Sequence, residues 1–375
     1  VAFDVAAWLR GGRLLIQPLH WALMALLAGW LAELGLAVGR EWLASLRRLR
    51  WLGPRAVFGL TTVALLAGLG GSARMRAALG FADGGPAFLD SYAILATLDA
   101  VRAGISPDAP NPYDPLLRNH KYSDWWLGLG SLGLTRADNF WFGAACGGVF
   151  LTAVLLTVRP RSVAEALWLA LLAGCPPVAF ALVRANNDLI IFGVLAVAVA
   201  AWRSTPAAWR DALAVAAIAV ATGLKFYPAA AAAAVVVLRP MRRLFGVGLG
   251  LALAVGLVLL LVGGQMIRGT FDVQPGVHVV GARLWFHDLG LPDGAALSAS
   301  VAAFVKGAWL LRRAHAPRET STGDLAMFAV AAAVLAACFL AGLSFSYRLI
   351  FAIWLGPWLW AEAARGDGAR SVSLA

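Results

Sequence analysis

The sequence predicts an all-α polytopic membrane protein with about 10–11 transmembrane helices. Of its 375 residues, 61% are hydrophobic, and the mean hydropathy is +0.77. Charged residues make up only 14%, well below the usual quarter of soluble domains. Because no polar linker divides the chain, we expect residues 1–375 to form a single transmembrane domain.

Long apolar runs mark the expected helices in chain order. They are 14–38, 56–71, 141–158, 163–182, 189–202, 211–223, 226–238, 244–262, 296–311, 324–341 and 349–362. The segment 14–55 is interpreted as an extra N-terminal span and a cytoplasmic loop. At "GLKFYP" two short helices are expected to meet at a break, because Pro228 lacks the N–H that a continuing helix requires.

The arginines predict the orientation of these helices. They recur in every second loop, so the positive-inside rule places those loops in the cytoplasm. This pattern explains the net charge of +11 and argues against a nucleic-acid partner, which would need one basic stripe. We expect a multi-pass protein of a bacterial inner membrane, with these segments facing outward: 72–140, 183–188, 224–225, 263–295 and 342–348.

The first outer loop, 72–140, is too long for a simple connection and is expected to be structured and catalytic. Within it, "PAFLDSYAILATLDAVRAG" predicts a helix lying on the membrane surface, with Pro86 near its start and Gly104 just past its end. Apolar residues recur in this stretch at helical spacing: Phe88, Leu95, Leu98 and Val101.

Unusual polar motifs gather on the predicted outer side. Because they flank several separate spans, they indicate a shared cavity at one membrane face. The motifs are "NPYDP", "NHKYSDWW", "RANNDL", "GLKFYP", "VHVVGARLWFHD" and "FSYR".

Three of these stretches resemble a known family. "DSYAILATLDAVRAG…NPYDP" is similar to the first outer loop of GT-C superfamily membrane glycosyltransferases, and most of all to bacterial polyprenyl-phosphate-mannose-dependent mannosyltransferases. "RANNDLIIFGVLAVA" and "GLKFYPAAAAAAVVVL" stand where that group has a polar helix start and a lysine and proline at a broken helix. The resemblance covers roughly residues 56–360. The chain differs by its extra N-terminal span and by "VHVVGARLWFHD", which stands where the group often has Asn-Gln-Ser.

The resemblance implies a hexosyltransferase that takes a sugar, mannose or another hexose, from a polyprenyl-phosphate donor. The acceptor would be an extracytoplasmic glycolipid, polysaccharide or protein. The residues agree, because the chain has neither a Gly-rich phosphate loop nor an Asp-x-Asp pair for a nucleotide sugar. An inverting transfer needs a carboxylate base and cations that stabilise the departing phosphate.

Asp90 is the expected base, although a carboxylate in a first helical turn is also favoured by the helix dipole. Lys225 and Arg348 are the expected phosphate ligands. The alternatives are a lysine that snorkels to the interface and an arginine that anchors the topology. Asp83, in "ADGGP", is more readily a turn residue.

Further residues are expected to bind the substrate. Asp124, beside two tryptophans, would bind sugar hydroxyls unless it belongs to an interfacial aromatic belt. Arg184 with Asn187 would contact the donor unless Arg184 forms a local salt bridge to Asp188, one helical turn away. The remaining candidates are Tyr92, His120 and Tyr227.

No cofactor is expected. The spacing of His120, His278 and His287 matches no zinc motif, while Mg²⁺ or Mn²⁺ held by carboxylates stays open. Two rival functions also remain: a secondary transporter with helices broken at "AGCPP" and "GLKFYP", and a structural subunit of a cell-envelope complex.

Overall fold

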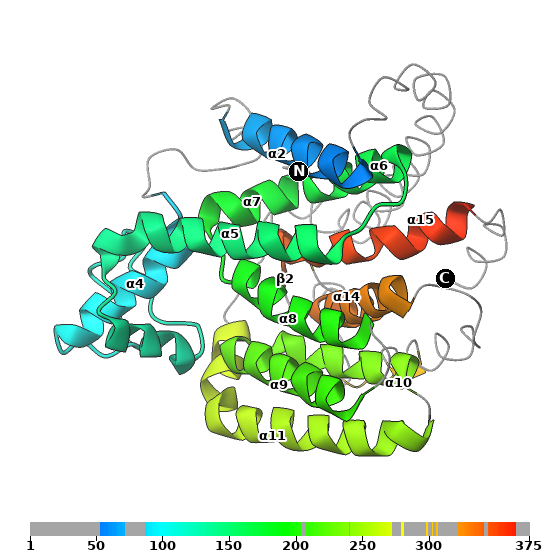
Figure 1. Cartoon of the computed structure of the whole chain (residues 1–375). Helices are drawn as coiled ribbons and strands as arrows, with labels where there is room; N and C mark the ends of the chain where they lie inside the picture. Colours follow the sequence, from blue (N-terminus) through cyan, green and yellow to red (C-terminus); the bar gives the residue numbers. More distant parts are fainter. Residues whose placement is uncertain are drawn as a thin grey trace, which may run out of the picture.

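The computed structural model describes residues 53–71, 87–203, 207–239, 241–271, 322–340 and 344–364, with isolated residues between 279 and 306 (Figure 1). The predicted run 14–38 and most of 296–311 lie outside the described residues. The described chain is mostly helical, which confirms the all-α prediction. A two-residue antiparallel pair, Val279–Val280 with Ser344–Phe345, is the exception among them.

The elements follow the predicted apolar runs closely. In chain order they are α2 (Pro54–Gly71), α4 (Leu89–Arg102), η2 (Asp124–Leu132), η3 (Arg136–Asp138), α5 (Asn139–Thr157), α6 (Val163–Ala173), α7 (Pro176–Arg184), α8 (Asp188–Arg203), α9 (Ala208–Leu224), η4 (Tyr227–Ala233), α10 (Ala234–Leu238), α11 (Met241–Phe271), β1 (Val279–Val280), α14 (Thr322–Leu340), β2 (Ser344–Phe345), η5 (Ser346–Trp354) and α15 (Gly356–Ala364).

Helix α8 lies at the centre of the bundle. It packs against α5, α9 and α14, and α11 packs on the far side of α9 (Figure 1). The α8 residues Leu189, Ile191 and Leu195 are fully buried, and the Phe192 ring stacks on Trp354 of η5 with centroids 4.0 Å apart. A helix that is apolar on all sides suits this enclosed position.

Two predicted breaks are present in the structure. The predicted span 163–182 is a bent pair, because α6 and α7 meet at an angle of 52° where Pro176 begins α7. At "GLKFYP", α9 ends at Leu224 and the 3₁₀ helix η4 begins at Tyr227. Both breaks interrupt the apolar runs where proline removes a backbone donor.

Helix α4 ends as predicted but is more enclosed than expected. Gly104 adopts a left-handed φ of +77°, the conformation that glycine accepts most readily. Leu95 and Leu98 are buried, while Val101 is exposed. The helix packs against η2, η3, α5 and α7, so most of its apolar residues face protein instead of a surface.

Large apolar side chains cover much of the outside of the bundle. Leu60, Leu156 and Leu260 have exposed fractions of 62%, 65% and 86%, respectively. Among the described residues, the helix Arg136–Thr157 is long and apolar enough to cross a membrane, and the α6–α7 pair passes the same test if counted as one span.

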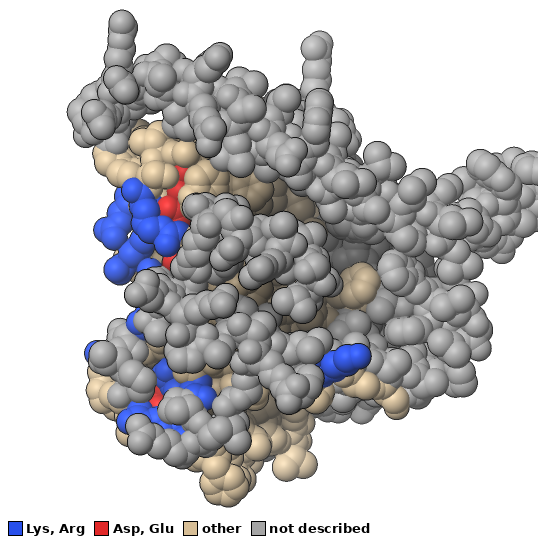
Figure 2. Space-filling view, turned by 90° about the vertical axis from the view of Figure 1, so that its right-hand side faces the viewer, with Lys and Arg blue, Asp and Glu red and all other residues tan. Residues whose placement is uncertain are grey.

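The two ends of the bundle differ in charge. At the end opposite α4, described arginines outnumber the acidic residues, and Figure 2 shows Lys and Arg side chains gathered on that face. Arg161 there binds Glu165 and Asp324, and Arg239 binds Asp211. At the α4 end, acidic and basic residues are present in similar numbers.

Candidate functional site

Segments far apart in the sequence meet at the α4 end of the bundle (Figure 1). They are the start of α4, the loop before η2, the α7–α8 turn, the α9–η4 break and the start of η5. Their buried or half-buried polar side chains form what we call the charged cluster: Asp90, Arg118, Tyr122, Arg184, Asn186, Asn187, Asp188, Lys225, Tyr227, Tyr347 and Arg348.

Asp90 is the anion at one side of the cluster. Its carboxylate accepts hydrogen bonds from Arg184 Nε at 3.0 Å and Nη2 at 2.5 Å, and from Asn186 Nδ2 at 2.7 Å. Arg118 Nη1 lies 3.4 Å from Oδ1. A carboxylate offers about four acceptor positions, so nearly all of them are occupied.

Opposing effects act on the pKa of Asp90. Burial raises this pKa. The hydrogen bonds from Arg184 and Asn186 and the positive charges of Arg184 and Arg118 lower it by more, so the pKa lies below its usual value of 3.8. Asp90 is therefore ionised, and in this arrangement it is a weak proton acceptor. Its predicted role as a base requires its arginine partners to move.

The "NPYDP" motif positions Arg118. Asn111 Oδ1 accepts the Tyr113 N–H, and the buried Asp114 accepts from Arg118 Nε at 2.6 Å and from Nη2 at 3.1 Å. Arg118 also donates to the Leu89 carbonyl at 2.9 Å. The turn thus holds the guanidinium across the first turn of α4, beside Asp90.

Asp188 is the anion at the other side of the cluster. Its side chain is fully buried at the N-terminus of α8, where the helix dipole favours negative charge. Lys225 Nζ donates to Asp188 Oδ1 at 2.6 Å and to Asn187 Oδ1 at 3.1 Å. Arg348 Nε lies 3.8 Å from Asp188 Oδ2. Both predicted phosphate ligands therefore face one carboxylate.

Aromatic rings enclose the cations of the cluster. Lys225 Nζ lies 5.8 Å from the ring centroid of Tyr122 and 5.7 Å from those of Tyr227 and Tyr347. Arg348 Cζ lies 4.9 Å above the Tyr227 ring. Such faces attract cations and exclude water at the same time. Burial raises the pKa of Tyr122, so its phenol is neutral and remains a hydrogen-bond donor.

The α7–α8 turn connects the two anions. Ala185 adopts a left-handed φ of 43°, which ends α7 and directs Arg184 toward Asp90. The amide of Asn186 donates to Asp90, and its Oδ1 accepts the backbone N–H of Asp188 at 2.9 Å. The alternative salt bridge from Arg184 to Asp188 is therefore not the one that forms, since each charge has a different partner.

Asp124 lies outside the charged cluster. It is exposed at the start of η2, and the two tryptophans that follow it fix the loop to α9. Trp126 Nε1 donates to the Leu224 carbonyl at 3.1 Å, and the Trp125 ring fills the space where Gly223 has no side chain. The tryptophans therefore position the loop beside the α9–η4 break.

Tyr92 and His120 do not join the ion pairs of the cluster. Tyr92 lies beside Arg136. His120 Nε2 lies 3.3 Å from the Ser123 carbonyl, and its ring meets Tyr122 edge-on. Burial lowers the pKa of His120, so its ring is neutral at pH 7.

Several other candidates add nothing to the site. Asp83, His278 and His287 lie outside the described residues, and Lys306 is exposed. Within the described part of the chain, no three His, Cys, Asp or Glu residues gather in a way that could hold a metal ion.

Sequence reasoning missed five members of the cluster as site residues. Four of them stand inside motifs that the sequence marked as unusual, and Arg118 lies between two such motifs, so composition was a signal, but only folding reveals their partners. They are Arg118, Tyr122, Asn186, Asp188 and Tyr347.

Comparison of the chain with family models, curated proteins and solved structures found no match. The function is therefore argued from the site itself.

Proposed function

We propose that the chain is an integral membrane glycosyltransferase that moves a hexose from a polyprenyl-phosphate donor to an extracytoplasmic acceptor. The observation that carries this proposal is a set of four buried or half-buried cations at one end of an apolar bundle, Arg118, Arg184, Lys225 and Arg348. They pair with three buried carboxylates, Asp90, Asp114 and Asp188. Charges buried at such cost usually have a task.

Membrane insertion is supported by the distribution of side chains. Leucines project from the outside of the bundle, while arginines concentrate at the end opposite α4. Phe140 and Trp141, at the α4 end of α5, have exposed fractions of 59% and 74%, as interfacial aromatic residues do. This distribution would place the charged cluster at the outer boundary.

A phosphate suits these cations better than the present carboxylates do in number and geometry. Arginine forks bind phosphate oxygens in pairs, and Lys225 supplies a compact charge. We infer that the donor phosphate displaces Asp90 from Arg184 and Asp188 from Lys225. The two carboxylates would then balance the charge of these cations until the donor binds.

The same displacement would convert Asp90 into a base. Once Arg184 binds the phosphate, the largest effect that lowers the Asp90 pKa is gone, while burial still raises it. The acceptor oxygen attacks the anomeric carbon and its proton passes to Asp90. The bond between that carbon and the phosphate oxygen breaks, and the electron pair goes to the phosphate, which the cations stabilise.

A secondary transporter is the second candidate, favoured by the two broken helices, α6–α7 and α9–η4, that flank the cluster. One experiment separates the two functions. Purified protein is incubated with a panel of polyprenyl-phosphate sugars, and release of free lipid phosphate is measured. We expect release with at least one donor. Absence of release throughout the panel, together with uptake of a solute by reconstituted vesicles, would favour the transporter.

A further inference from the structure

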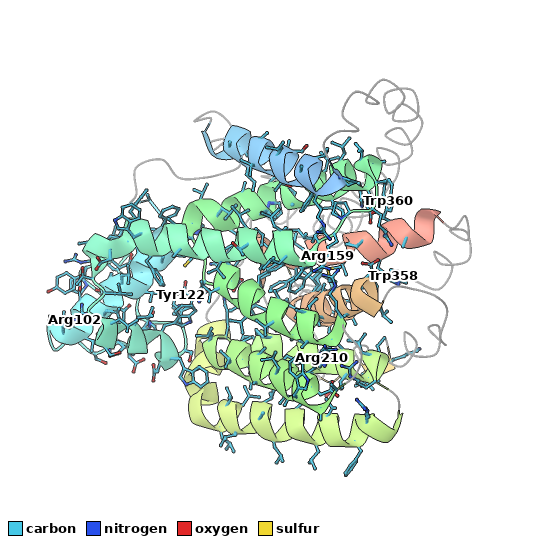
Figure 3. All side chains as sticks on the ribbon, in the orientation of Figure 1. Arg102, Tyr122, Arg159, Arg210, Trp358 and Trp360 are labelled. Atoms are coloured by element: carbon cyan, nitrogen blue, oxygen red, sulfur yellow. The ribbon has the colours of Figure 1, made fainter. Side chains whose placement is uncertain are left out.

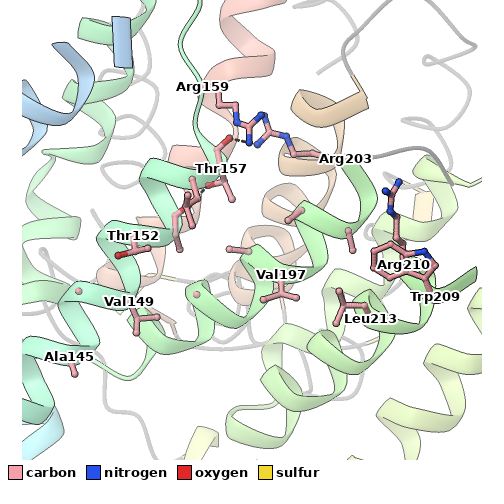
Figure 4. Close-up of a pocket in the computed structure, with 17 residues that line it drawn as sticks. Ala145, Val149, Thr152, Thr157, Arg159, Val197, Arg203, Trp209, Arg210 and Leu213 are labelled. Atoms are coloured by element: carbon pink, nitrogen blue, oxygen red, sulfur yellow. Dashed lines mark hydrogen bonds between the residues drawn. The ribbon is translucent and has the colours of Figure 1, made fainter. Parts of the chain in front are cut away.

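A groove lies near the other end of the bundle, away from the charged cluster. It has a volume of about 970 Å³ and runs between α5, α8 and the beginning of α9 (Figure 4). Figure 3 places Tyr122 at the α4 end, whereas Arg159 and Arg210 lie toward the opposite end. The groove is therefore separate from the proposed reaction site.

The floor of the groove is made by small residues and its sides by exposed aliphatic ones. A Cβ added at Gly148 would meet nothing within 4 Å, so this position faces open space. At Gly193, by contrast, a Cβ would lie 2.4 Å from Val149 Cγ1, because α5 and α8 approach closely there. Leu156 and Val197 line the sides and have exposed fractions of 65% and 41%.

The length of the groove matches one lipid leaflet. Along α5 it extends from Ala145 to Thr157, which is about 18 Å at 1.5 Å per residue. Half of a hydrocarbon core of about 30 Å is about 15 Å. An extended acyl chain would therefore fit along the groove within a single leaflet.

Arginines from three segments surround one end of the groove: Arg159, Arg203 and Arg210 (Figure 4). Arg203 Nη1 donates to the Thr157 carbonyl at 2.7 Å, which fixes its position.

Positive charges lie close together at this end. Arg203 is repelled by Arg159 and Arg55, and the acid that attracts it, Asp324, already pairs with Arg161 at 3.1 Å. An anion would relieve this repulsion.

Trp209 has an exposed fraction of 62%, and the Arg210 guanidinium lies 5.0 Å from its ring centroid. Tryptophan prefers the level of lipid headgroups, and a basic group beside it attracts anionic lipid. The aromatic ring and the arginines therefore match the headgroup of a lipid. The apolar groove matches one of its acyl chains.

We propose that this groove binds one anionic phospholipid of the arginine-rich leaflet. Its phosphate lies against Arg159, Arg203 and Arg210, and one acyl chain lies along α5 and α8. The proposal rests on insertion of the chain in a membrane and is independent of sugar transfer.

Native mass spectrometry of the detergent-purified full chain tests this proposal. The probes are phosphatidylglycerol and phosphatidylcholine with identical acyl chains, and inorganic phosphate as a competitor. We expect one phosphatidylglycerol to be retained at least about ten-fold better than phosphatidylcholine, because basic residues near the membrane surface attract anionic lipid. We also expect little competition from phosphate alone, because phosphate lacks the chain that fills the groove.

Two classes of variant locate the lipid. The double variant Arg159→Gln/Arg210→Gln should abolish the preference for phosphatidylglycerol. Gly148→Leu should fill the groove and reduce retention of both lipids, and Val197→Phe provides an independent filling variant. Gly246→Leu is the matched control, since Gly246 on α11 also faces open space.

Equal retention of both lipids by the unmodified protein would refute the proposal. So would unchanged retention in the filling variants, or displacement of the lipid by phosphate alone, which would indicate a simple anion site. Size-exclusion profiles and melting temperatures identify variants that fail to fold. If one filling variant fails, the other decides the question.

Discussion

Replacement of Lys225 by methionine tests the central contact of the charged cluster. Methionine keeps the length and apolar character of the stem but removes the ammonium group. The side chain of Lys225 is only 12% exposed and lies 2.6 Å from the fully buried Asp188. The single substitution therefore leaves the Asp188 carboxylate buried, with Arg348 Nε at 3.8 Å as a cation that still faces it.

Two effects on different observables are expected. Removal of one member of a buried ion pair destabilises a protein by about 3–5 kcal/mol. If Lys225 also stabilises the departing phosphate, turnover should fall by about 10²–10³-fold, as it does when one oxyanion donor is removed.

A double variant separates the two effects. In Lys225→Met/Asp188→Asn, the buried carboxylate is neutralised together with its partner, so much of the lost stability should return. Activity should not return, because the phosphate still lacks the ammonium group. Thermal unfolding in detergent and release of lipid phosphate from the donor measure the two quantities on the same samples.

Full turnover by the stable double variant would refute the assignment of Lys225 to the phosphate. The lysine would then serve only to neutralise Asp188. A melting temperature equal to that of the unmodified protein in the single variant would refute the ion pair itself. Lys225→Arg is a useful companion, since it keeps the charge and changes the geometry.

Three further predictions concern Asp90 and the topology. Asp90→Asn should lower turnover by about 10²–10⁴-fold while donor binding persists, because the amide cannot take a proton; near-normal turnover would remove its role as the base. Because the pKa of Asp90 in the folded protein lies below 3.8, its ionised form should contribute stability above pH 3.8, and this contribution should be lost as the pH falls through the lower folded value. The melting temperature should therefore fall less below pH 4 in Asp90→Asn, and an equal fall in both proteins would contradict the pairing. In a background without the native cysteines, an impermeant thiol reagent should label Leu116→Cys but not Ala208→Cys in intact cells, and the reverse pattern would invert the topology.

The local features of this fold were predictable because they depend on nearest neighbours. Pro228 removes a backbone donor wherever it stands, so the break before η4 could be placed from sequence. The same physics acts at Pro176, although the run 163–182 reads as one span and is bent by 52°. Gly104 ends α4 for an equally local reason.

The partners of the charges were not predictable in this way. Arg184 and Asp188 are four residues apart, which favours a pair on one helix. Instead Ala185 turns the chain, so Arg184 reaches Asp90, which is 94 residues away in the sequence. Which carboxylate meets which cation depends on how α4, α7 and α9 pack, and a pattern read along one segment contains no such information.

The short turn at Asn186 would link proton binding at Asp90 to binding of the proposed donor phosphate. Asn186 Nδ2 donates to the Asp90 carboxylate and its Oδ1 accepts the backbone N–H of Asp188, so one side chain ties Asp90 to the residue that carries the second carboxylate. An anion that draws Arg184 away raises the affinity of Asp90 for a proton, and by reciprocity a proton on Asp90 strengthens binding of the anion. Calorimetric titration of a phosphate-bearing ligand in two buffers of different ionisation enthalpy would register this exchange as proton uptake, and identical heats in both buffers would show that the two sites act separately.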